Sequence, residues 1–229
     1  MNWTITWLGH SAFEIRGNGH SILIDAFLSD NPVAAARPDT LNPDLILLSH
    51  AHGDHLGDTL DIAKRTGAPV VCNFEIGNWL EARGAKVHQQ NPGGGHDHGV
   101  AHVKFTMAHH SSSFPDGGYG GEPNGFIITL PDGKRLYFAG DTSLFLDMQL
   151  IGEEGIDLAF MPIGDNYTKG PADSLRAIRM IKPRLVLPMH YNTWDESNQD
   201  ANAWAESVRS QTDAQPIVLQ PGGSYELQD

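Results

Sequence analysis

The chain begins with short β-rich runs bounded by turn residues. Three such runs, 4–8, 12–15 and 20–24, are separated by Gly-His and Gly-Asn-Gly segments, and this pattern is typical of strands joined by hairpin turns. The run 45–48 differs because every position in it is apolar. A continuous apolar run of this length predicts a strand that is buried on both faces.

In the rest of the chain, segments with apolar residues at helical spacing alternate with short apolar runs typical of strands. The segment 111–123 interrupts them; it is rich in Gly, Ser and Pro, which is more typical of a functional loop or lid than of a plain connection. We find no internal repeat and no linker, so we expect one domain over residues 1–229. The expected helices are 56–65, 75–83, 173–181 and 201–210, and the expected strands are 70–71, 100–108, 125–130, 135–139, 156–161, 185–187, 217–219 and 225–227.

Composition and net charge indicate which kinds of binding partner the chain can have. Of 229 residues, 40% are hydrophobic and 19% are charged, which is ordinary for a globular protein. Fifteen Lys and Arg against 28 Asp and Glu give a net charge of −13, and so acidic a chain is a poor partner for nucleic acid or an anionic membrane. We therefore expect a small-molecule substrate, with no nucleic-acid or membrane partner, and leave assembly into a homo-oligomer open.

The single cysteine and the N-terminus bear on the compartment. Cys72 is the only cysteine, so no intrachain disulfide can form, and its apolar setting predicts a buried strand residue. The first residues lack the basic region and apolar run of a signal peptide, and no stretch approaches ~18 uninterrupted apolar residues. We expect a cytoplasmic protein.

The segment 49–55, Ser-His-Ala-His-Gly-Asp-His, carries the strongest chemical signal. It follows the buried strand and precedes a helix, where a scaffold can fix functional side chains that a loop exposes. Imidazoles and carboxylates are ligands that transition metals favour. In an extended stretch His50 and His52 project the same way, while Asp54 and His55 can turn toward a second ion. Crowding these imidazoles without a metal would cost desolvation for no evident gain.

Later strand ends supply further ligand types. His109 and His110 end one predicted strand, Asp141 follows another and His190 follows a third. Each of them alone fits an ordinary structural role, but their recurrence at the ends of buried strands favours a shared site. Asp141 lies where a carboxylate could bridge two ions.

In the order of these candidate ligands along the sequence, the chain resembles the metallo-β-lactamase superfamily of metal-dependent hydrolases. The match consists of His50-x-His52-x-Asp54-His55, then His110, Asp141 and His190. The resemblance implies a four-layer αββα sandwich of two mixed β-sheets flanked by helices, with a two-metal site at one edge of the sheets. The chain looks closest to a small branch similar to ascorbate-phosphate lactonases, on the segments 9–11, 139–142, 162–166 and 189–193.

The resemblance also implies roles for these residues. His50, His52 and His110 would hold one ion, Asp54, His55 and His190 the other, and Asp141 would bridge them. The implied cofactor is two divalent metal ions per chain, zinc first, with manganese or iron as alternatives. Coordination lowers the pKa of water from 15.7 to about 7, so a hydroxide held between the ions would be the nucleophile, oriented by Asp54.

Strand alternation separates the two neighbouring histidines. It places His109 on the side of Val103 and Phe105, and therefore in the core or behind the ligands, whereas His110 falls on the polar side of the strand with Lys104. We therefore take His110 as the ligand.

Several other residues are candidates for supporting roles. Asp25 could stand behind a metal-bound imidazole and fix its tautomer, and His10, at a strand end, could face the substrate as a catalytic residue. Lys169 is the one basic candidate near the site for a phosphorylated substrate. The remaining candidates, at the pocket rim or beside a ligand, are Asp165, Asn166, Tyr167, Tyr191 and Asn192.

A second His-x-His pair follows three glycines. His96 and His98 have no histidine or acidic partner at a comparable strand end, so we expect a flexible turn there. His20, His88 and His102 are expected to be surface or hydrogen-bonded residues.

The function these residues predict is hydrolysis of an ester, lactone, amide or phosphodiester bond in a small molecule. Two alternatives stay open. A mononuclear iron oxygenase on the same fold would use fewer ligands, and a nonenzymatic, metal-dependent regulatory module would turn over no substrate.

Overall fold

The N-terminal runs form the antiparallel half of a first β-sheet. In the computed structural model, which describes residues 2–228, β1 (Trp3–Gly9), β2 (Ala12–Gly17) and β3 (His20–Ile24) pair successively in antiparallel register. The β2–β3 turn uses Asn18 and Gly19 at positive φ, a conformation that Gly and Asn adopt most readily. These strands match the expected ones to within two residues at either end.

The other half of the first sheet is parallel. β3, β4 (Leu45–Leu47), β5 (Val70–Cys72) and β6 (Val87–Gln89) pair in parallel. Parallel neighbours need crossover connections, and helices supply the last two of them. β14 (Ser224–Leu227) pairs with β1 and completes the order β14-β1-β2-β3-β4-β5-β6. The helices of this half are α1 (Gly53–Leu56), α2 (Thr59–Thr66) and α3 (Phe74–Glu81), and a 3-10 turn spans Pro38–Thr40.

The second sheet repeats this mixed plan. Its order is β13-β12-β11-β10-β9-β8-β7, antiparallel from β7 to β10 and parallel from β10 to β13. The remaining elements are β7 (Gly95–Asp97), β8 (His102–Met107), β9 (Asn124–Thr129), β10 (Arg135–Phe138), α4 (Met148–Glu153), β11 (Leu158–Pro162), α5 (Pro171–Ile181), β12 (Leu185–Met189), a 3-10 turn (Asp195–Ser197), α6 (Ala201–Gln211), β13 (Gln215–Pro216) and β14 (Ser224–Leu227).

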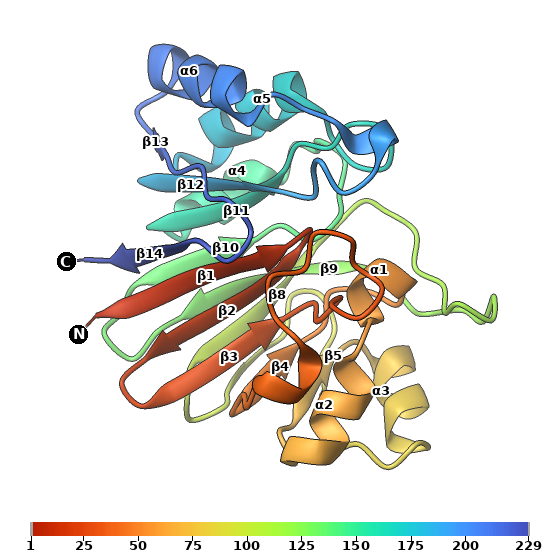
Figure 1. Cartoon of the computed structure of the whole chain (residues 1–229). Coiled ribbons are helices and arrows are strands. Elements are labelled where there is room, and N and C mark those ends of the chain that lie inside the picture. The colour runs from red at the N-terminus through yellow and green to blue at the C-terminus, as the bar shows by residue number, and fades with distance from the viewer. Residues whose placement is uncertain (1, 229) are drawn as a thin grey trace.

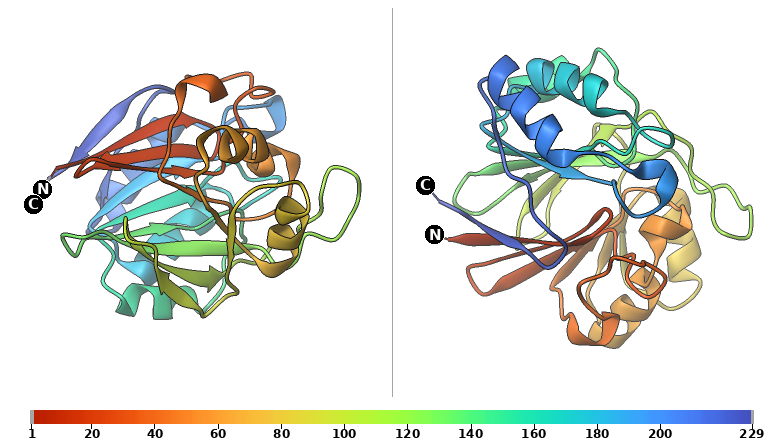
Figure 2. Two further views of the ribbon diagram at one scale, coloured as in Figure 1. Left: turned by 90° about the horizontal axis from the view of Figure 1, so that it is seen from below. Right: turned by 45° about the horizontal axis from the view of Figure 1, so that its top comes forward.

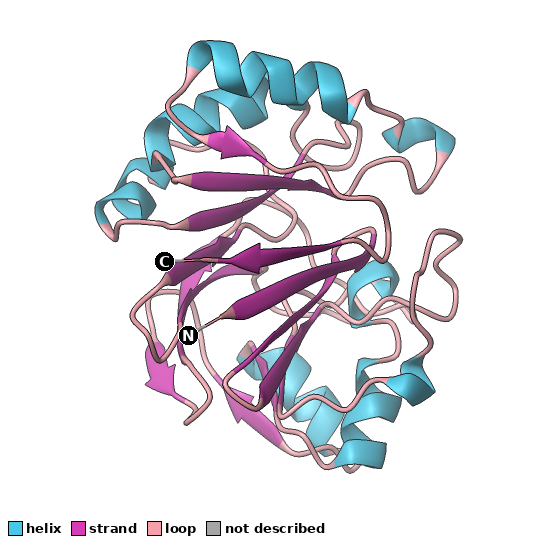
Figure 3. Cartoon of the chain, turned by 60° about the vertical axis from the view of Figure 1, so that its left-hand side comes forward, coloured by secondary structure: helices cyan, strands magenta, loops and turns pink. Residues whose placement is uncertain are grey.

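The two sheets pack face to face between two layers of helices. In Figure 1, α1, α2 and α3 lie against the first sheet and α4, α5 and α6 against the second, and Figure 3 shows the same helix–sheet–sheet–helix order from another side. The expected αββα sandwich is confirmed. Among the described residues, none of the helices combines the length and apolar character needed to span a bilayer.

The all-apolar strand β4 explains how the layers hold together. Leu45 and Leu47 belong to the core between the sheets, whereas Ile46 and Leu48 belong to the core between the first sheet and its helices. Because successive side chains point to opposite faces, one short run serves both cores, as its sequence predicts. Cys72 is buried in the second of these cores, where burial raises the pKa of its thiol.

Some expected elements differ from the structure. The helix expected over 56–65 is divided into α1 and α2 at Gly57, whose φ of +40° lets the chain turn beneath Ala26. The strand expected at 217–219 lies at Gln215–Pro216; Ile217 makes one more backbone hydrogen bond, to Val186, before the chain leaves the sheet edge. β6, β7 and α4 were not expected.

The long loop 111–123 is anchored at its base. Ser112 Oγ accepts a hydrogen bond from Ala51 N (3.1 Å) and donates one to the Gly120 carbonyl (3.0 Å). A single bridge joins Ser113 to Tyr119. Beyond this base the loop extends away from the body of the molecule, as Figures 1 and 2 show.

Candidate metal centre

The histidine-rich segment lies in the connection between β4 and α1. His52 has an extended backbone (φ −60°, ψ 148°), and α1 begins at Gly53. His50 is fully buried, and its Nε2 lies 3.0 Å from His52 Nδ1. His110, which follows β8 in the other sheet, comes within 5.2 Å of the His50 ring and 5.1 Å of the His52 ring, centroid to centroid. One ring nitrogen from each of these three residues lies within 4.8 Å of the others, so they can share one ion.

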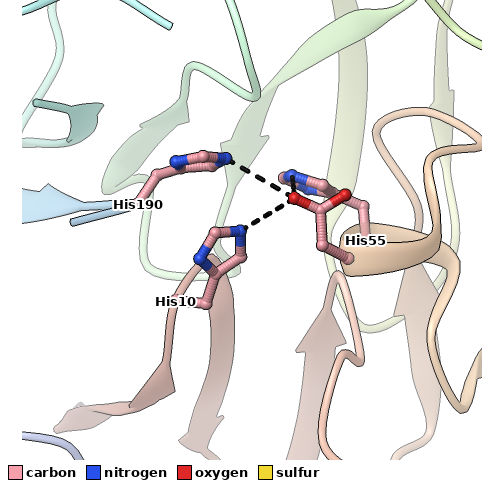
Figure 4. A group of neighbouring side chains, drawn as sticks. His10, His55 and His190 are labelled. Atoms are coloured by element: carbon pink, nitrogen blue, oxygen red, sulfur yellow. Dashed lines mark hydrogen bonds and ion pairs between the residues drawn. The ribbon is translucent and has the colours of Figure 1, made fainter. Parts of the chain in front are cut away.

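A second group forms around α1. One ligand atom each from Asp54, His55 and His190 lies within 4.8 Å of the others, and His10 belongs to the same group. Asp54 Oδ2 is 3.2 Å from His10 Nε2, 3.7 Å from His190 Nε2 and 3.9 Å from His55 Nε2. Figure 4 shows His10, His55 and His190 with ring nitrogens turned toward one carboxylate oxygen.

Asp141 lies between the two groups. Its Oδ2 is 3.0 Å from His190 Nε2, 3.3 Å from His55 Nε2 and 3.6 Å from His110 Nε2. Asp141 also shares a possible ligand set with His50 and His55. Burial alone would raise the pKa of Asp141, but His190 and His55 hold it well below its ordinary value. The carboxylate is therefore ionised and placed to contact ligands of both groups.

The unpaired polar atoms here fit a metal. Within the described part of the chain, His55 Nε2, His190 Nε2 and Asp141 Oδ1 are buried and make no hydrogen bond of acceptable geometry. Leaving such atoms buried and unpaired costs about 1–3 kcal/mol each. Both ring nitrogens lie within 3.3 Å of Asp141 Oδ2, and imidazole with carboxylate is a donor set that suits divalent transition metals. Coordination would satisfy all three atoms.

Asp25 orients a ligand of each group. The buried carboxylate accepts hydrogen bonds from His55 Nδ1 (2.7 Å) and from Ser49 Oγ (2.6 Å), and that hydroxyl lies 3.0 Å from His50 Nδ1. With Nδ1–H engaged on both rings, each ring in its neutral form directs its Nε2 lone pair toward a metal, which is the usual arrangement behind a metal-bound histidine. Asp25 therefore lies behind the candidate ligands, the position expected for it from the sequence.

The carboxylates around His55 make this position favourable for positive charge. Burial alone would lower the pKa of His55, but Asp141, Asp25 and Asp54 together raise it well above its ordinary value. By contrast, burial lowers the pKa of His50 well below its ordinary value, with a further contribution from His55.

His10 is placed differently from expectation. It was expected to face the substrate, but its side chain is fully buried and lies outside the lining of the cavity above the ligands. Its Nδ1 lies 2.8 Å from Thr193 Oγ1 and its Nε2 3.2 Å from Asp54. Burial and the neighbouring His190 lower the pKa of His10 to about 3. His10 is thus a neutral imidazole that fixes Asp54.

A cavity of about 540 Å³ opens over the ligands. Aromatic side chains form part of its wall, and Glu196 adds a carboxylate at the exposed side. None of the lining residues is Lys or Arg. The lining comprises His52, Asp54, His110, Ser111, Asp141, Tyr167, Trp194 and Glu196.

The polar loop after β11 reaches this cavity at only one position. Tyr167 lines it, whereas Asp165 and Asn166 are exposed outside the lining. Lys169, expected at the rim, is instead buried, and its Nζ donates to the Thr142 carbonyl at 3.3 Å. Burial lowers the pKa of Lys169 to about 7.

Three other candidates point away from the ligands. Tyr191 stacks on Trp7 with ring centroids 5.2 Å apart, and Asn192 accepts a hydrogen bond from Gln199 N (2.7 Å), beside a separate hollow. His109 is exposed and stacks on Phe145 at 4.6 Å, so the expectation of a core or supporting role is wrong.

Some residues at the site were not singled out in the sequence. Ser49 and Ser111 directly adjoin a ligand, and Thr193, Trp194 and Glu196 follow His190 by three to six positions. Sequence proximity to a ligand is the signal that could have found them.

Comparisons with known proteins bear on the fold and the class of this chain. A family model described as a beta-lactamase superfamily domain matches residues 20–191. The chain is 47% identical over 223 residues to a UPF0173 metal-dependent hydrolase of Desulforamulus reducens, covering 95% of this chain and 97% of that one. It is 46% identical over 218 residues to a UPF0173 metal-dependent hydrolase of Thermus thermophilus, covering 95% and 96%. The solved structure of Igni18, a metallo hydrolase from Ignicoccus hospitalis, superposes with a TM-score of 0.91 at 35% identity and full coverage of both chains.

Proposed function

The chain belongs to the metallo-β-lactamase superfamily and is a metal-dependent hydrolase, and from that premise we propose that it holds two divalent cations and hydrolyses an uncharged ester, lactone or amide of a small molecule. The observation that carries the proposal is the position of Asp141, within 3.6 Å of histidines from both ligand groups. A carboxylate in this position can contact both ions of a two-metal site, whose ions lie about 3.5–4 Å apart.

The proposed ligands are those that the motif and the strand ends supply. His50, His52 and His110 would hold one ion, Asp54, His55 and His190 the second, and Asp141 both. When bound, the cations supply Lewis acidity, which lowers the pKa of water and polarises the bond under attack. We propose zinc, because a histidine-rich set with carboxylates suits it, with manganese or iron as the alternatives.

Asp54 is the ligand carboxylate best placed to orient an attacking water. Its side chain is 27% exposed, against 2% for Asp141, so it can meet a water molecule that enters from the cavity. Burial alone would raise the pKa of Asp54, but His55 and the hydrogen bond from His10 hold it well below its ordinary value. Asp54 is therefore ionised and can accept a hydrogen bond from the attacking water and orient it.

The cavity favours an uncharged substrate. Tyr167 and Trp194 offer aromatic surface, and Glu196 would repel an anion near the opening. For a phosphodiester the proposed cations would be the only positive partners, because no Lys or Arg lines the cavity and Lys169 is buried beneath the site. Together with the net charge of −13, this supports a small molecule without phosphate and argues against nucleic acid.

The alternatives are supported less well. A mononuclear iron oxygenase would use one ligand group and leave the other without a role, and a nonenzymatic module would not need the open cavity. The relatives at 46–47% identity carry the name of hydrolase.

Elemental analysis with an activity screen tests the proposal. Protein purified without added metal should contain two divalent ions per chain and should turn over members of an ester, lactone and amide panel in preference to phosphodiesters. One iron per chain with no hydrolysis would contradict it.

Replacing the shared carboxylate provides the matched variant. Asp141→Asn should lower metal content and reduce activity by at least about 100-fold, while circular dichroism shows the fold intact. Asp213→Asn, at an exposed carboxylate, is the control and should leave both unchanged. Full metal content and turnover in Asp141→Asn would count against the two-metal assignment.

A further inference from the structure

Three more imidazoles meet at an edge of the sandwich, apart from the metal centre. His88 lies on β6, His96 lies on β7 and His98 directly follows it. Their ring centroids are 4.2 Å (His88–His96), 4.7 Å (His88–His98) and 4.9 Å (His96–His98) apart. One ring nitrogen from each lies within 4.8 Å of the others. We call these residues the edge histidines; none of them belongs to the site described above.

The sheet register explains why they converge. β6 and β7 are the last strands of the first and second sheets. His88 pairs with Val71 and His96 pairs with Val103, and both valines belong to the core between the sheets. Paired residues on neighbouring strands point to the same face. Histidines therefore occupy positions where apolar side chains would otherwise close this edge of the core, which corrects the expectation of a flexible turn without a partner.

A buried amide holds one of the rings. Gln90 Oε1 accepts a hydrogen bond from His98 Nε2 at 2.9 Å. The Gln90 amide nitrogen donates to the carbonyls of Val103 (3.1 Å) and Gly94 (3.3 Å), which fixes the orientation of the amide. With Nε2 as the donor, Nδ1 of His98 keeps its lone pair. A histidine that donates its other N–H to a fixed carbonyl oxygen is typical of metal ligation.

The surroundings of His88 and His98 favour the neutral form that binds metal. Burial and the neighbouring His88 and His96 lower the pKa of His98 to about 4. Burial and His96 likewise lower the pKa of His88. Neutral imidazoles can donate their lone pairs at neutral pH.

We propose that the edge histidines bind a divalent transition-metal ion that joins β6 of the first sheet to β7 of the second. Three imidazoles suit zinc, copper or nickel, and the exposed side at His96 leaves a further position to water. Because the ligands come from both sheets, an ion bound here would tie together two edge strands that share no backbone hydrogen bonds in the described sheets. Its role would be structural.

Zinc binding to matched variants tests the proposal. Metal-free protein would be dialysed against micromolar Zn²⁺ at pH 7.5, and the bound zinc measured for wild type, His96→Ala and His20→Ala. His96 is exposed, so its removal spares the core, and His20 is a partly exposed histidine on β3. His96→Ala should retain one zinc fewer per chain than wild type, and His20→Ala the same number as wild type. Equal zinc in wild type and His96→Ala would overturn the proposal.

A second background separates this site from the hydrolase centre. In Asp141→Asn the loss of one zinc on adding His96→Ala should persist, whatever the metal content of the centre. Gln90→Leu should weaken the same zinc by about 10–100-fold, the usual effect of removing a hydrogen-bonded partner of a ligand. In a zinc-soaked crystal, anomalous density between the three rings is expected, and its absence would contradict the site. None of these measurements depends on a substrate.

Discussion

Asp25 influences both metal groups although it lies outside the motif. It contacts His55 directly and His50 through Ser49. The backbone at Asp25 has a φ of +45°, a conformation that is uncommon outside glycine. The uncommon backbone conformation after β3 thus positions one carboxylate behind two candidate ligands.

Replacing this carboxylate with an amide should weaken metal binding without emptying the core. In Asp25→Asn an amide nitrogen, which cannot accept, would face either Ser49 N or the pair His55 Nδ1 and Ser49 Oγ, so zinc affinity should fall by about 10–100-fold. Competition with a chelator of known affinity measures it. Asp30→Asn, at an exposed carboxylate, serves as control, and an unchanged affinity in Asp25→Asn would show that the ligands hold their orientation without it.

Lys169 makes stability depend on pH in the metal-free protein. Burial lowers its pKa from an ordinary 10.5 to about 7, and Asp141 only partly opposes this. Between pH 7 and 10.5 the unfolded chain therefore binds more protons at this residue than the folded chain does. The free energy of unfolding should rise with pH in this window, by up to about 1.4 kcal/mol per pH unit. Below pH 7 the amine is protonated in both states, so this rise with pH should be absent there.

Lys169→Met isolates that contribution. Denaturant unfolding in a chelating buffer, at several values between pH 7 and 10, should show a shallower rise for Lys169→Met than for wild type. Parallel pH curves for the two proteins would mean that the amine stays protonated in the fold.

At the scale of single residues, the sequence predicts which residues form the site better than it predicts where their side chains point. A strand followed directly by a helix is enough to bring together the four side chains of the motif, His50, His52, Asp54 and His55. The wrong expectations cluster where strands stop: β8 ends at Met107, so alternation no longer applies at His109. His10, Asp165, His190 and Asn192 all have positive φ, which turns the chain in a way that no periodic pattern records.

Among elements, strands with an apolar face were predicted well, whereas of the edge strands β14 was predicted to within one residue and β6, β7 and β13 poorly. β3 was predicted to the residue, and β4 to within one. β6 and β7 contain only one apolar residue, Val87, and place histidines at core-facing positions. Each pairs with a single neighbour in its own sheet, β5 or β8, and local periodicity cannot reveal such a pairing.

The break between α1 and α2 makes a testable contrast between two glycines. A Cβ at Gly57 (φ +40°) would overlap the Ala26 carbonyl and lie 2.6 Å from Phe27 Cα, whereas at Gly67 (φ +75°) the nearest atom is 3.8 Å away. Gly67→Ala should cost about 1–2 kcal/mol for its left-handed backbone, and Gly57→Ala roughly 1–3 kcal/mol more for the clash. Urea unfolding of both variants measures the difference. Equal costs would show that the turn beneath Ala26 adjusts freely.

Across the whole molecule, the metal centre is assembled from both halves of the sandwich. The first sheet and its α1 connection supply His50, His52, Asp54 and His55, and the ends of the second sheet supply the others. The proposed ions therefore connect two layers that otherwise meet through the apolar core, and they neutralise carboxylates in a chain of net charge −13.

Removing metal should consequently destabilise the whole domain and not only the site. Ions present at about 1,000 times their dissociation constant contribute about 4 kcal/mol, so chelation should lower Tm by on the order of 10 °C. Calorimetry with and without a chelator measures this, in the His96→Ala background so that the edge histidines do not contribute. Asp141→Asn in that background should respond less, because its centre holds less metal to lose. A chelator-independent Tm would mean that the core alone holds the sheets together, and that the metal centre has catalytic importance without a structural one.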